Sequence, residues 1–322
     1  MFLAPAIHQS DPPVVRPGAK LECVWTGGKQ TEGPAAAPDG AILFCDLTWS
    51  AIPGPKAAGH LRRFDPRTGK TTIVRSPSGQ ANGLKFDAEG RMLTAEGADG
   101  GGRRICRTDP KTGETTILAD RFMDRPLNSP NDLVLAHDGA IFFSDPRYQG
   151  MEPVEQPVQG IYRIAPDGTV TLVVADAVPN GVALSPDERT LYVADYDPGT
   201  TNLPRLAPGA RPRKRMRLLA YDLLPSGRTK FRAVLADYGD ADGADSLNVD
   251  SEGRVYAAVQ DHARSGVRIY TSEGRQVGEI PTPEIPTNMA FGRGSEAGTL
   301  YITAGASLYR ISTSARGLEA AR

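Results

Sequence analysis

Six residues that carry a side-chain oxygen recur at one position of a repeated pattern, 43 to 65 residues apart. A position that served packing alone would be apolar or small, because an unpaired buried polar group costs roughly 1–3 kcal/mol. Oxygen donors, two of them anionic, are the ligands that a hard cation such as Ca²⁺ prefers. These anchor residues are Glu32, Asn82, Asn131, Asn180, Asp245 and Asn288.

Two other interpretations of the anchor position remain open. Asn-Gly and Asn-Asp pairs favour turns, so a turn is as good an interpretation as a ligand for any single Asn. The shared position of Glu32 and Asp245 with four Asn favours a common site. Zn²⁺, Mn²⁺ and Mg²⁺ are alternatives to Ca²⁺, although neither the histidines nor the cysteines occupy the anchor position, which makes zinc less suitable.

The elements around the anchors predict an all-β fold. Each anchor begins an apolar strand, most units continue through an Asp/Glu-Gly turn, and a second, a third and usually a fourth strand follow. Four strands in about 45–50 residues are typical of a propeller blade. The sequence therefore predicts a six-bladed β-propeller of four-stranded blades. A linear array or a pair of sandwiches fits the even period less well.

The last unit has a third strand at 307–311 and no clear fourth strand. An isolated strand at 21–25 precedes the first anchor, where every other anchor is preceded by a fourth strand. We expect this N-terminal strand to complete the last blade and close the ring, which removes two open sheet edges. The expected organisation is an N-terminal extension at 1–18, one propeller domain at 19–313 and a tail at 314–322.

In a propeller the first strand of each blade lies nearest the axis, so the six anchors should point at one place. A second position also carries acids, at the ends of the second strands of the first four blades. We interpret these side chains as ligands of backbone amides at the strand ends, with a second cation site as the alternative. They are Asp46, Glu96, Asp145 and Asp195, whereas blades five and six have Val259 and Ala304.

Composition narrows the range of partners. The net charge is −1, so nothing favours nucleic acid, and the basic run at 211–217 is interpreted as a solvated loop. No apolar run approaches the roughly 18 residues of a membrane span. Three cysteines without a C-x-x-C pair predict buried free thiols. We expect a cytoplasmic protein, with export as the alternative, that is a monomer or a weak oligomer.

Several stretches resemble the gluconolactonase, senescence-marker-protein and luciferin-regenerating-enzyme (SMP-30-like) family, over roughly residues 20–311. The most specific are 128–134, 179–185 and 287–292, supported by 300–303 and 307–310. The resemblance implies a six-bladed propeller with one divalent metal, held by Glu32, Asn131, Asn180 and Asp245.

At some positions this sequence departs from the pattern of the family. In some members the residue that matches Asn131 contacts substrate, and Ser129 stands where some have an Arg. The blade-five motif is usually Asp-Gly, here Asp245-Ser246, with Asp242-Gly243 just before it. Asp245 is the preferred ligand, since residues 247–250 then align with the other first strands.

The expected activity is hydrolysis of a sugar lactone, with metal-bound water attacking the lactone carbonyl. Asp245 would orient or deprotonate that water, and Asn131 would assist it. Asn82, Asn288 and Ser129 would contact the substrate or support the ligands. The alternatives are a hydrolase of other esters or phosphotriesters, and a non-catalytic propeller that binds a ligand or partner.

Overall fold

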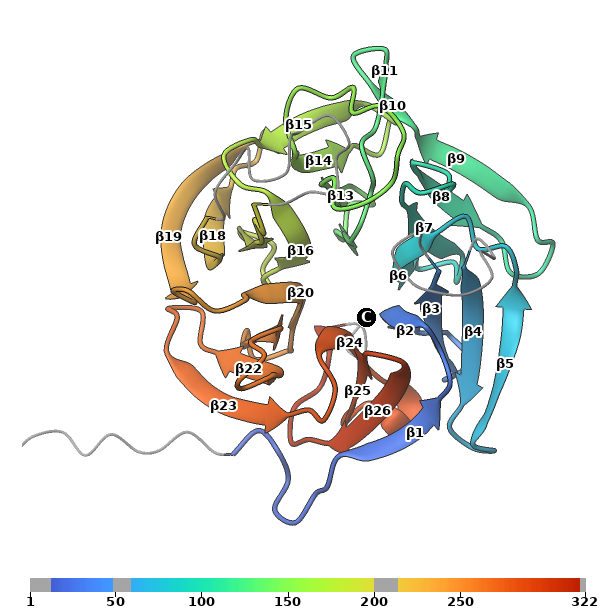
Figure 1. Ribbon diagram of the computed structural model, residues 1–322, viewed down its shortest axis with the longest axis vertical. Coiled ribbons are helices and arrows are strands. Elements are labelled where there is room, and N and C mark those ends of the chain that lie inside the picture. Colours follow the sequence, from blue (N-terminus) through green and yellow to red (C-terminus); the bar gives the residue numbers. More distant parts are fainter. Residues whose placement is uncertain (1–12, 49–58, 200–213, 319–322) are drawn as a thin grey trace, which may run out of the picture.

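The computed structural model describes residues 13–48, 59–199 and 214–318. Six four-stranded antiparallel sheets stand around a central channel, and the first strand of each sheet lies innermost (Figure 1). Each inner strand contacts the inner strands of the two neighbouring blades. The six-bladed β-propeller predicted from the repeats is therefore confirmed.

The strands of each blade run outward in chain order. Blade one contains β2 (Gln30–Ala36), β3 (Ile42–Leu47), β4 (His60–Asp65) and β5 (Lys70–Arg75). Blade two contains β6 (Ala81–Phe86), β7 (Met92–Glu96), β8 (Arg104–Thr108) and β9 (Thr115–Ala119). Blade three contains β12 (Leu133–Leu135), β13 (Ile141–Asp145), β14 (Gly160–Ile164) and β15 (Val170–Val174). Blade four contains β16 (Pro179–Leu184), β17 (Thr190–Asp195), β18 (Arg217–Leu223) and β19 (Thr229–Asp237). Blade five contains β20 (Ala244–Val249), β21 (Val255–Val259), β22 (Gly266–Tyr270) and β23 (Gln276–Pro281).

Blade six closes the ring. It contains β24 (Pro286–Phe291), β25 (Thr299–Ala304) and β26 (Ser307–Ser312), and its outer strand is β1 (Glu22–Thr26) from the other end of the chain. β1 pairs antiparallel with β26, with Cys23 opposite Tyr309 and Thr26 opposite Ser307. The predicted N-terminal closing strand is therefore confirmed, and no sheet edge is left between the first and last blades.

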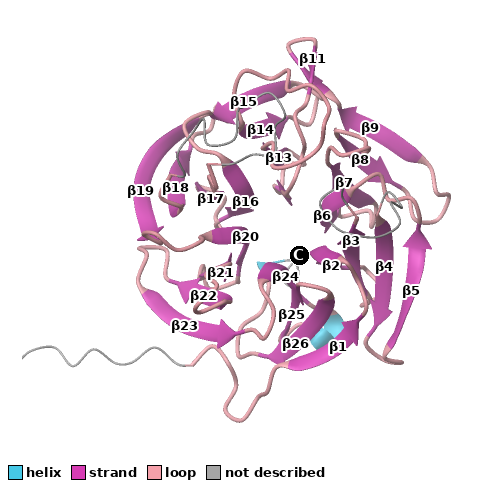
Figure 2. Ribbon diagram, in the orientation of Figure 1, coloured by secondary structure: helices cyan, strands magenta, loops and turns pink. Residues whose placement is uncertain are grey.

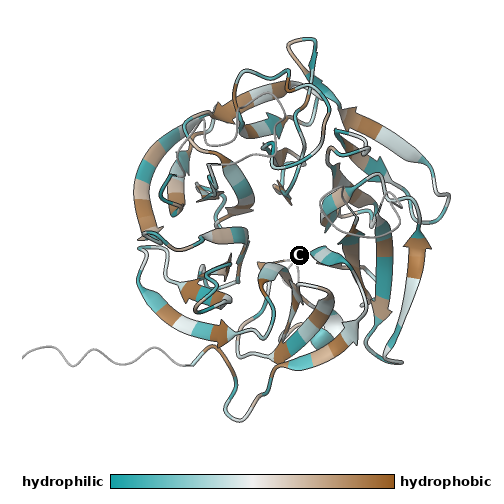
Figure 3. Cartoon of the chain, in the orientation of Figure 1, coloured by the Kyte–Doolittle hydropathy of each residue, from teal (hydrophilic) through white to brown (hydrophobic). Residues whose placement is uncertain are grey.

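Six apolar clusters hold the blades together, one between each pair of neighbours. Alternation along the strands builds them, because successive side chains point to opposite faces of a sheet. In β3, Ile42 and Phe44 pack toward blade six, whereas Leu43 and Cys45 pack toward blade two. Figure 3 shows brown residues in every blade, interspersed with teal and white ones along the outer strands. The packed blades hold the inner strands, and with them the anchors, in fixed positions.

Few other elements interrupt the strands (Figure 2). The hairpin β10 (Arg121–Phe122) and β11 (Arg125–Pro126) lies between blades two and three, and the 3-10 helix η1 (Gly294–Glu296) lies between β24 and β25. No helix in the described ranges has the length and apolar character to cross a membrane.

All three cysteines are free thiols. Cys45 and Cys106 are buried as predicted, whereas Cys23 is exposed. The prediction of a buried thiol was wrong for Cys23 because its strand, β1, is the outermost of blade six.

Candidate functional site

The anchors lie where the inner strands depart from regular pairing. Five of the six inner strands shift register against their second strand at or beside the anchor. In blades two, four and five the residues without a partner are the anchor and its successor, Asp245 and Ser246 in blade five. Such bulges increase the local twist and re-aim side chains. They explain why polar anchors face the channel and leave the apolar clusters undisturbed.

Glycine after the anchor lets neighbouring inner strands approach closely. A Cβ on Gly33 would lie 1.8 Å from the Asn82 carbonyl oxygen, and one on Gly181 would lie 2.5 Å from the Ser246 Cα. The N–H of Gly83 donates to the Asn131 carbonyl at 2.7 Å, which ties blade two to blade three. These approaches draw the anchors of adjacent blades together.

Two anchor carboxyl groups are buried and lie within electrostatic range of each other. Glu32 is 3% exposed and Asp245 is 7% exposed. Burial raises the pKa of Glu32 well above its usual value, and the charges of Asp245 and Asp132 raise it further. Burial also raises the pKa of Asp245 to about 8, with a further contribution from Asp132 and an opposing hydrogen bond from Asn180. Among the described residues no basic side chain contributes to either shift, so neither acid has a counter-charge within that part of the chain.

Asn180 supplies the clearest sign of a ligand site. Its amide hydrogen-bonds to Asp245, whereas its side-chain carbonyl oxygen is buried and has no hydrogen-bond partner in the described part of the chain. Buried polar atoms are normally satisfied, so an orphaned oxygen beside two acids needs an explanation. A bound cation would provide that oxygen with a partner.

The other predicted site residues differ in burial and in the hydrogen bonds that fix them. Asn131 is half-buried and precedes β12, and its backbone N–H donates to the Ser144 carbonyl at 3.0 Å. The Asn82 side chain is buried at the start of β6. The side-chain oxygen of Asn288 accepts from the Met289 N–H at 2.7 Å, which is the local turn contact considered as the structural alternative. The structure thus draws Glu32, Asn180 and Asp245 into one cluster more clearly than Asn82 or Asn288.

Ser129 and Asp242 lie outside this cluster of contacts. The Ser129 hydroxyl accepts from the Ala98 N–H at 2.9 Å and so fastens the glycine-rich loop that follows β7. Asp242 lies 3.6 Å from His262, between its carboxylate and the imidazole Nε2. The carboxylate of Asp132 contributes to the raised pKa of Asp245, which links Asp245 to the cluster.

Sequence reasoning missed Asp132. It follows the anchor Asn131, at the position where blades one, two and four have glycine. Its carboxylate is buried, accepts from the Ser246 hydroxyl at 2.6 Å across the channel, and contributes to the pKa shifts of Glu32 and Asp245. The signal in the sequence was a carboxylate at the position where three other blades have glycine.

The second ring of acids has internal partners. Asp145 accepts from the backbone N–H groups of Asn128 and Ser129 at 2.8 and 2.7 Å. Asp46 accepts from the Lys29 N–H at 2.7 Å, and Asp195 from the Val178 N–H at 3.0 Å. Glu96 instead pairs with Arg75 and Arg104. The interpretation as amide ligands therefore agrees with three of the four, and no cation is needed to explain any of them.

The basic run at 211–217 is only partly described, since residues 211–213 lie outside the described ranges. Arg217 belongs to β18 and pairs with Asp195 at 2.7 Å, and Arg215 lies 3.3 Å from Asp237. Met216 between them is fully buried. The solvated-loop interpretation is thus wrong for residues 216–217, because they are integrated into blade four.

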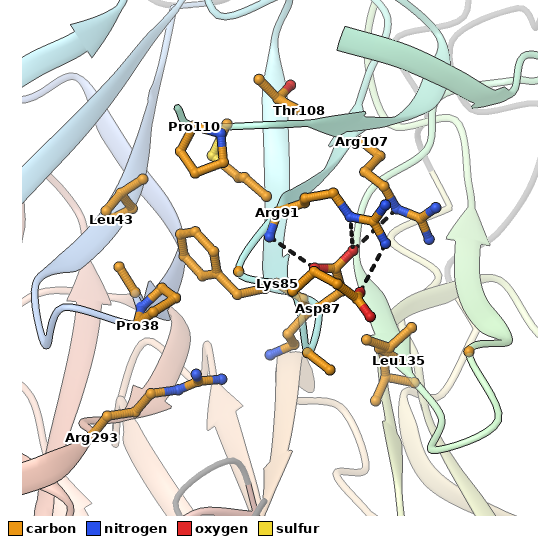
Figure 4. A pocket seen from close by; sticks show the side chains of 18 of the residues that line it. Pro38, Leu43, Lys85, Asp87, Arg91, Arg107, Thr108, Pro110, Leu135 and Arg293 are labelled. Carbon is orange, nitrogen blue, oxygen red and sulfur yellow. Dashed lines mark hydrogen bonds and ion pairs between the residues drawn. The ribbon is translucent and has the colours of Figure 1, made fainter. Parts of the chain in front are cut away.

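A cavity of about 1680 Å³ lies at the opposite end of the channel and contains none of the anchors. It is lined by the far ends of the inner strands and by the turns that follow them. Figure 4 shows Asp87 there between Arg91 and Arg107, with Lys85 and Arg293 projecting into the space. The cavity and the anchor cluster are separate features of one channel.

The chemistry of the anchor cluster suits a hard cation. Carboxylate and amide oxygens are the donors that Ca²⁺ accepts in flexible geometry. No group of three or more His, Cys, Asp or Glu side chains with the arrangement of a metal site occurs in the described ranges. Any cation here must therefore depend on the amide oxygens as well as on Glu32 and Asp245, and the orphaned Asn180 oxygen fits that requirement.

Comparisons with known proteins are consistent with this site. Residues 31–306 match the family described as the SMP-30/Gluconolactonase/LRE-like region. A gluconolactonase of Zymomonas mobilis is 30% identical over 92% of this chain and 82% of its own length. The solved structure of a gluconolactonase from Xanthomonas campestris is 27% identical, covers 94% of this chain and 95% of its own, and superposes with a TM-score of 0.76.

A more distant structure shares the fold. The calcium-binding protein regucalcin from Agrobacterium tumefaciens is 20% identical and superposes with a TM-score of 0.69, covering 92% of this chain and 94% of its own.

Proposed function

Since the chain belongs to the SMP-30/gluconolactonase/LRE-like family, we propose that it is a lactone hydrolase that opens a sugar lactone with the help of one divalent cation. The observation that carries this proposal is the pair of buried acids, Glu32 and Asp245, without a basic partner among the described residues. Uncompensated buried charge is costly unless it is paired or binds a metal. The gluconolactonase and regucalcin relatives support the same assignment.

Glu32, Asn131, Asn180 and Asp245 would hold the cation, with Ca²⁺ the preferred ion. When bound, the cation supplies positive charge that polarises the lactone carbonyl and stabilises the oxyanion. The ligand set combines two charges with amide oxygens, which suits an exchangeable site that leaves room for substrate. Mn²⁺, Mg²⁺ and Zn²⁺ are the alternatives to test.

Asp245 orients the attacking water and accepts its proton at a carboxylate oxygen. The negative charge of Asp132, 2.6 Å from the Ser246 hydroxyl, stays nearby and favours proton uptake by Asp245. Asn131 holds the substrate or the cation, and Asn82 and Asn288 hydrogen-bond substrate hydroxyl groups. Ser129 shapes the rim through its bond to Ala98.

A substrate panel tests the proposal directly. Hydrolysis of several aldonolactones and of one phosphotriester is followed by pH-stat, each with chelator and with Ca²⁺, Mn²⁺, Mg²⁺ or Zn²⁺ restored. Lactone hydrolysis that chelator abolishes and a divalent ion restores is the expected result. Phosphotriester hydrolysis alone would assign the site to another ester class, and the absence of chelator-sensitive turnover would leave a ligand-binding propeller.

A further inference from the structure

Gln260 lies beside the site, just after the second strand of blade five. It directly follows β21, whose last residue, Val259, pairs with Ala244 of the inner strand. Its backbone N–H donates to the Gly243 carbonyl at 2.9 Å. These contacts place the Gln260 side chain next to Asp245, the residue that follows Ala244.

The end of this strand differs in charge from those of blades one to four. These blades have a carboxylate at the position that Val259 occupies in blade five, and Gln260, the next residue, is neutral. A carboxylate in place of Gln260 would add negative charge beside the buried Asp245 and Asp132. An amide offers an N–H donor without a charge.

The hydrogen bonds of Gln260 determine which way its amide points. Its Nε2 donates to Asp245 Oδ2, and its Oε1 accepts from the Tyr196 hydroxyl at 2.9 Å. In the reversed orientation the amide oxygen would face a carboxylate oxygen, and two acceptors would repel each other. An ionised Asp245 and a donating Tyr196 are therefore both satisfied only in the observed orientation.

Tyr196 is itself fixed by its neighbours. Its N–H donates to the Val178 carbonyl at 2.9 Å, and its carbonyl accepts from the Tyr148 hydroxyl at 3.0 Å. The two tyrosine rings pack edge to face with centroids 5.9 Å apart. A chain of contacts thus runs from Tyr148 through Tyr196 and Gln260 to Asp245, and it joins blades three, four and five at the site.

We propose that Gln260 is a positioning residue that holds Asp245 Oδ2 and so leaves the other carboxylate oxygen for the cation, with Tyr196 selecting the orientation of the Gln260 amide. This inference rests on the proposed function, because it assigns Asp245 to a cation site. Groups that hydrogen-bond metal ligands fix their geometry, and losing one costs about 10–100-fold in metal affinity or activity. Holding one oxygen also keeps Asp245 from binding a cation through both oxygens.

Calorimetric titration of the metal-free full-length protein with Ca²⁺ and with Mg²⁺ tests the inference. The variants are Gln260→Leu, Tyr196→Phe and, as matched control, Gln156→Leu, because Gln156 also uses its amide in hydrogen bonds but bonds the backbone of the β10–β11 hairpin. We expect Gln260→Leu to weaken Ca²⁺ binding by about 10–100-fold. Tyr196→Phe should cause a smaller loss, and the control should bind like the unsubstituted protein.

The ratio of the two dissociation constants separates positioning from a general loss of structure. A released Asp245 can bind through both oxygens, which Ca²⁺ accepts and the stricter octahedral Mg²⁺ does not. The Mg²⁺-to-Ca²⁺ ratio of dissociation constants should therefore rise in Gln260→Leu by more than about threefold. An unchanged ratio overturns the inference even if both ions bind more weakly, and so does equal weakening in Gln156→Leu.

The outcomes also distinguish this inference from the proposed function. If the unsubstituted protein binds neither ion, the cation site itself fails and the role of Gln260 falls with it. If the unsubstituted protein binds Ca²⁺ and Gln260→Leu binds it equally well, only the role of Gln260 is wrong. Tyr196→Phe keeps the test decisive if Gln260→Leu does not fold.

Discussion

Buried carboxylates lie at both ends of the central channel, and the two ends differ in the basic partners that these acids have among the described residues. At the far end, Asp87 accepts from the Arg91 N–H at 2.8 Å and pairs with the Arg91 and Arg107 guanidinium groups at 2.8 and 3.3 Å (Figure 4). At the anchor end, no basic side chain in the described ranges contributes to the pKa shifts of Glu32 and Asp245, although Lys85 acts on the neighbouring Asp132. The fold thus supplies arginine to the buried acid at one end, whereas at the other end the cation proposed above would balance Glu32 and Asp245.

The largest effect on catalysis should come from removing Asp245, which is proposed both to bind the cation and to accept the proton of the attacking water. Asp245→Ala deletes a cation ligand and the proposed proton acceptor, so lactone kcat/KM should fall by more than about 1000-fold, or about 4 kcal/mol. Steady-state hydrolysis with saturating Ca²⁺ measures the loss, and circular dichroism checks the fold. Hydrolysis at the parental rate would remove Asp245 from the mechanism.

A smaller effect, on thermal stability, is expected when a divalent cation is added. A cation that binds only the folded state at about 100 times its dissociation constant stabilises it by about 2.7 kcal/mol, a rise in Tm of roughly 4 °C for a chain of this length. Thermal unfolding with chelator and with excess Ca²⁺ gives the shift. The Glu32→Gln variant should lose most of it, because one of the two anionic ligands is gone.

Replacing a buried carboxylate by its isosteric amide should change stability in opposite directions at the two ends of the channel. In the metal-free protein Glu32→Gln should raise stability, because an amide avoids the penalty that raises the Glu32 pKa. Asp87→Asn should lower stability by about 1–3 kcal/mol, because Arg91 and Arg107 lose their partner. Urea unfolding of both variants with chelator present measures the two signs, and two losses of similar size would contradict the contrast.

The fold and the anchor end of the channel could largely be predicted from the sequence. The repeat spacing indicates six blades, and the shared anchor position selects six residues, among which Glu32 and Asp245 stand out as acids and Asn180 through the family resemblance. Local patterns are enough for these features, because the strand period and the turn residues act within one blade. The N-terminal closing strand was also predictable, since an unpaired strand at one end matched an absent strand at the other.

The contacts between blades were not predictable in the same way. Asp132 is recognised only through its bond to Ser246, which lies 114 positions away in the chain and reaches it across the channel. Gln260 likewise depends on Tyr196, which reaches it from blade four. Neither residue lies at the anchor position, so periodicity could not select them. The solvent exposure of Cys23 was missed for a related reason, because the pattern of a strand does not say which blade face remains open.

The last prediction is a dependence of metal-free stability on pH that distinguishes the two ends. Folding raises the pKa of Glu32 and raises that of Asp245 to about 8, so between about pH 4 and pH 8 the folded state binds more protons than the unfolded state. Stability must then fall as pH rises through this window, by at most about 1.4 kcal/mol per pH unit for each proton. Urea unfolding at pH 5 to 8 in chelator should show this decline in the unsubstituted protein, and Glu32→Gln should flatten it because one of the acids with a raised pKa no longer titrates. Asp87→Asn, which leaves the anchor end intact, should keep the decline, and a slope that Glu32→Gln leaves unchanged would locate the titrating groups elsewhere in the ring.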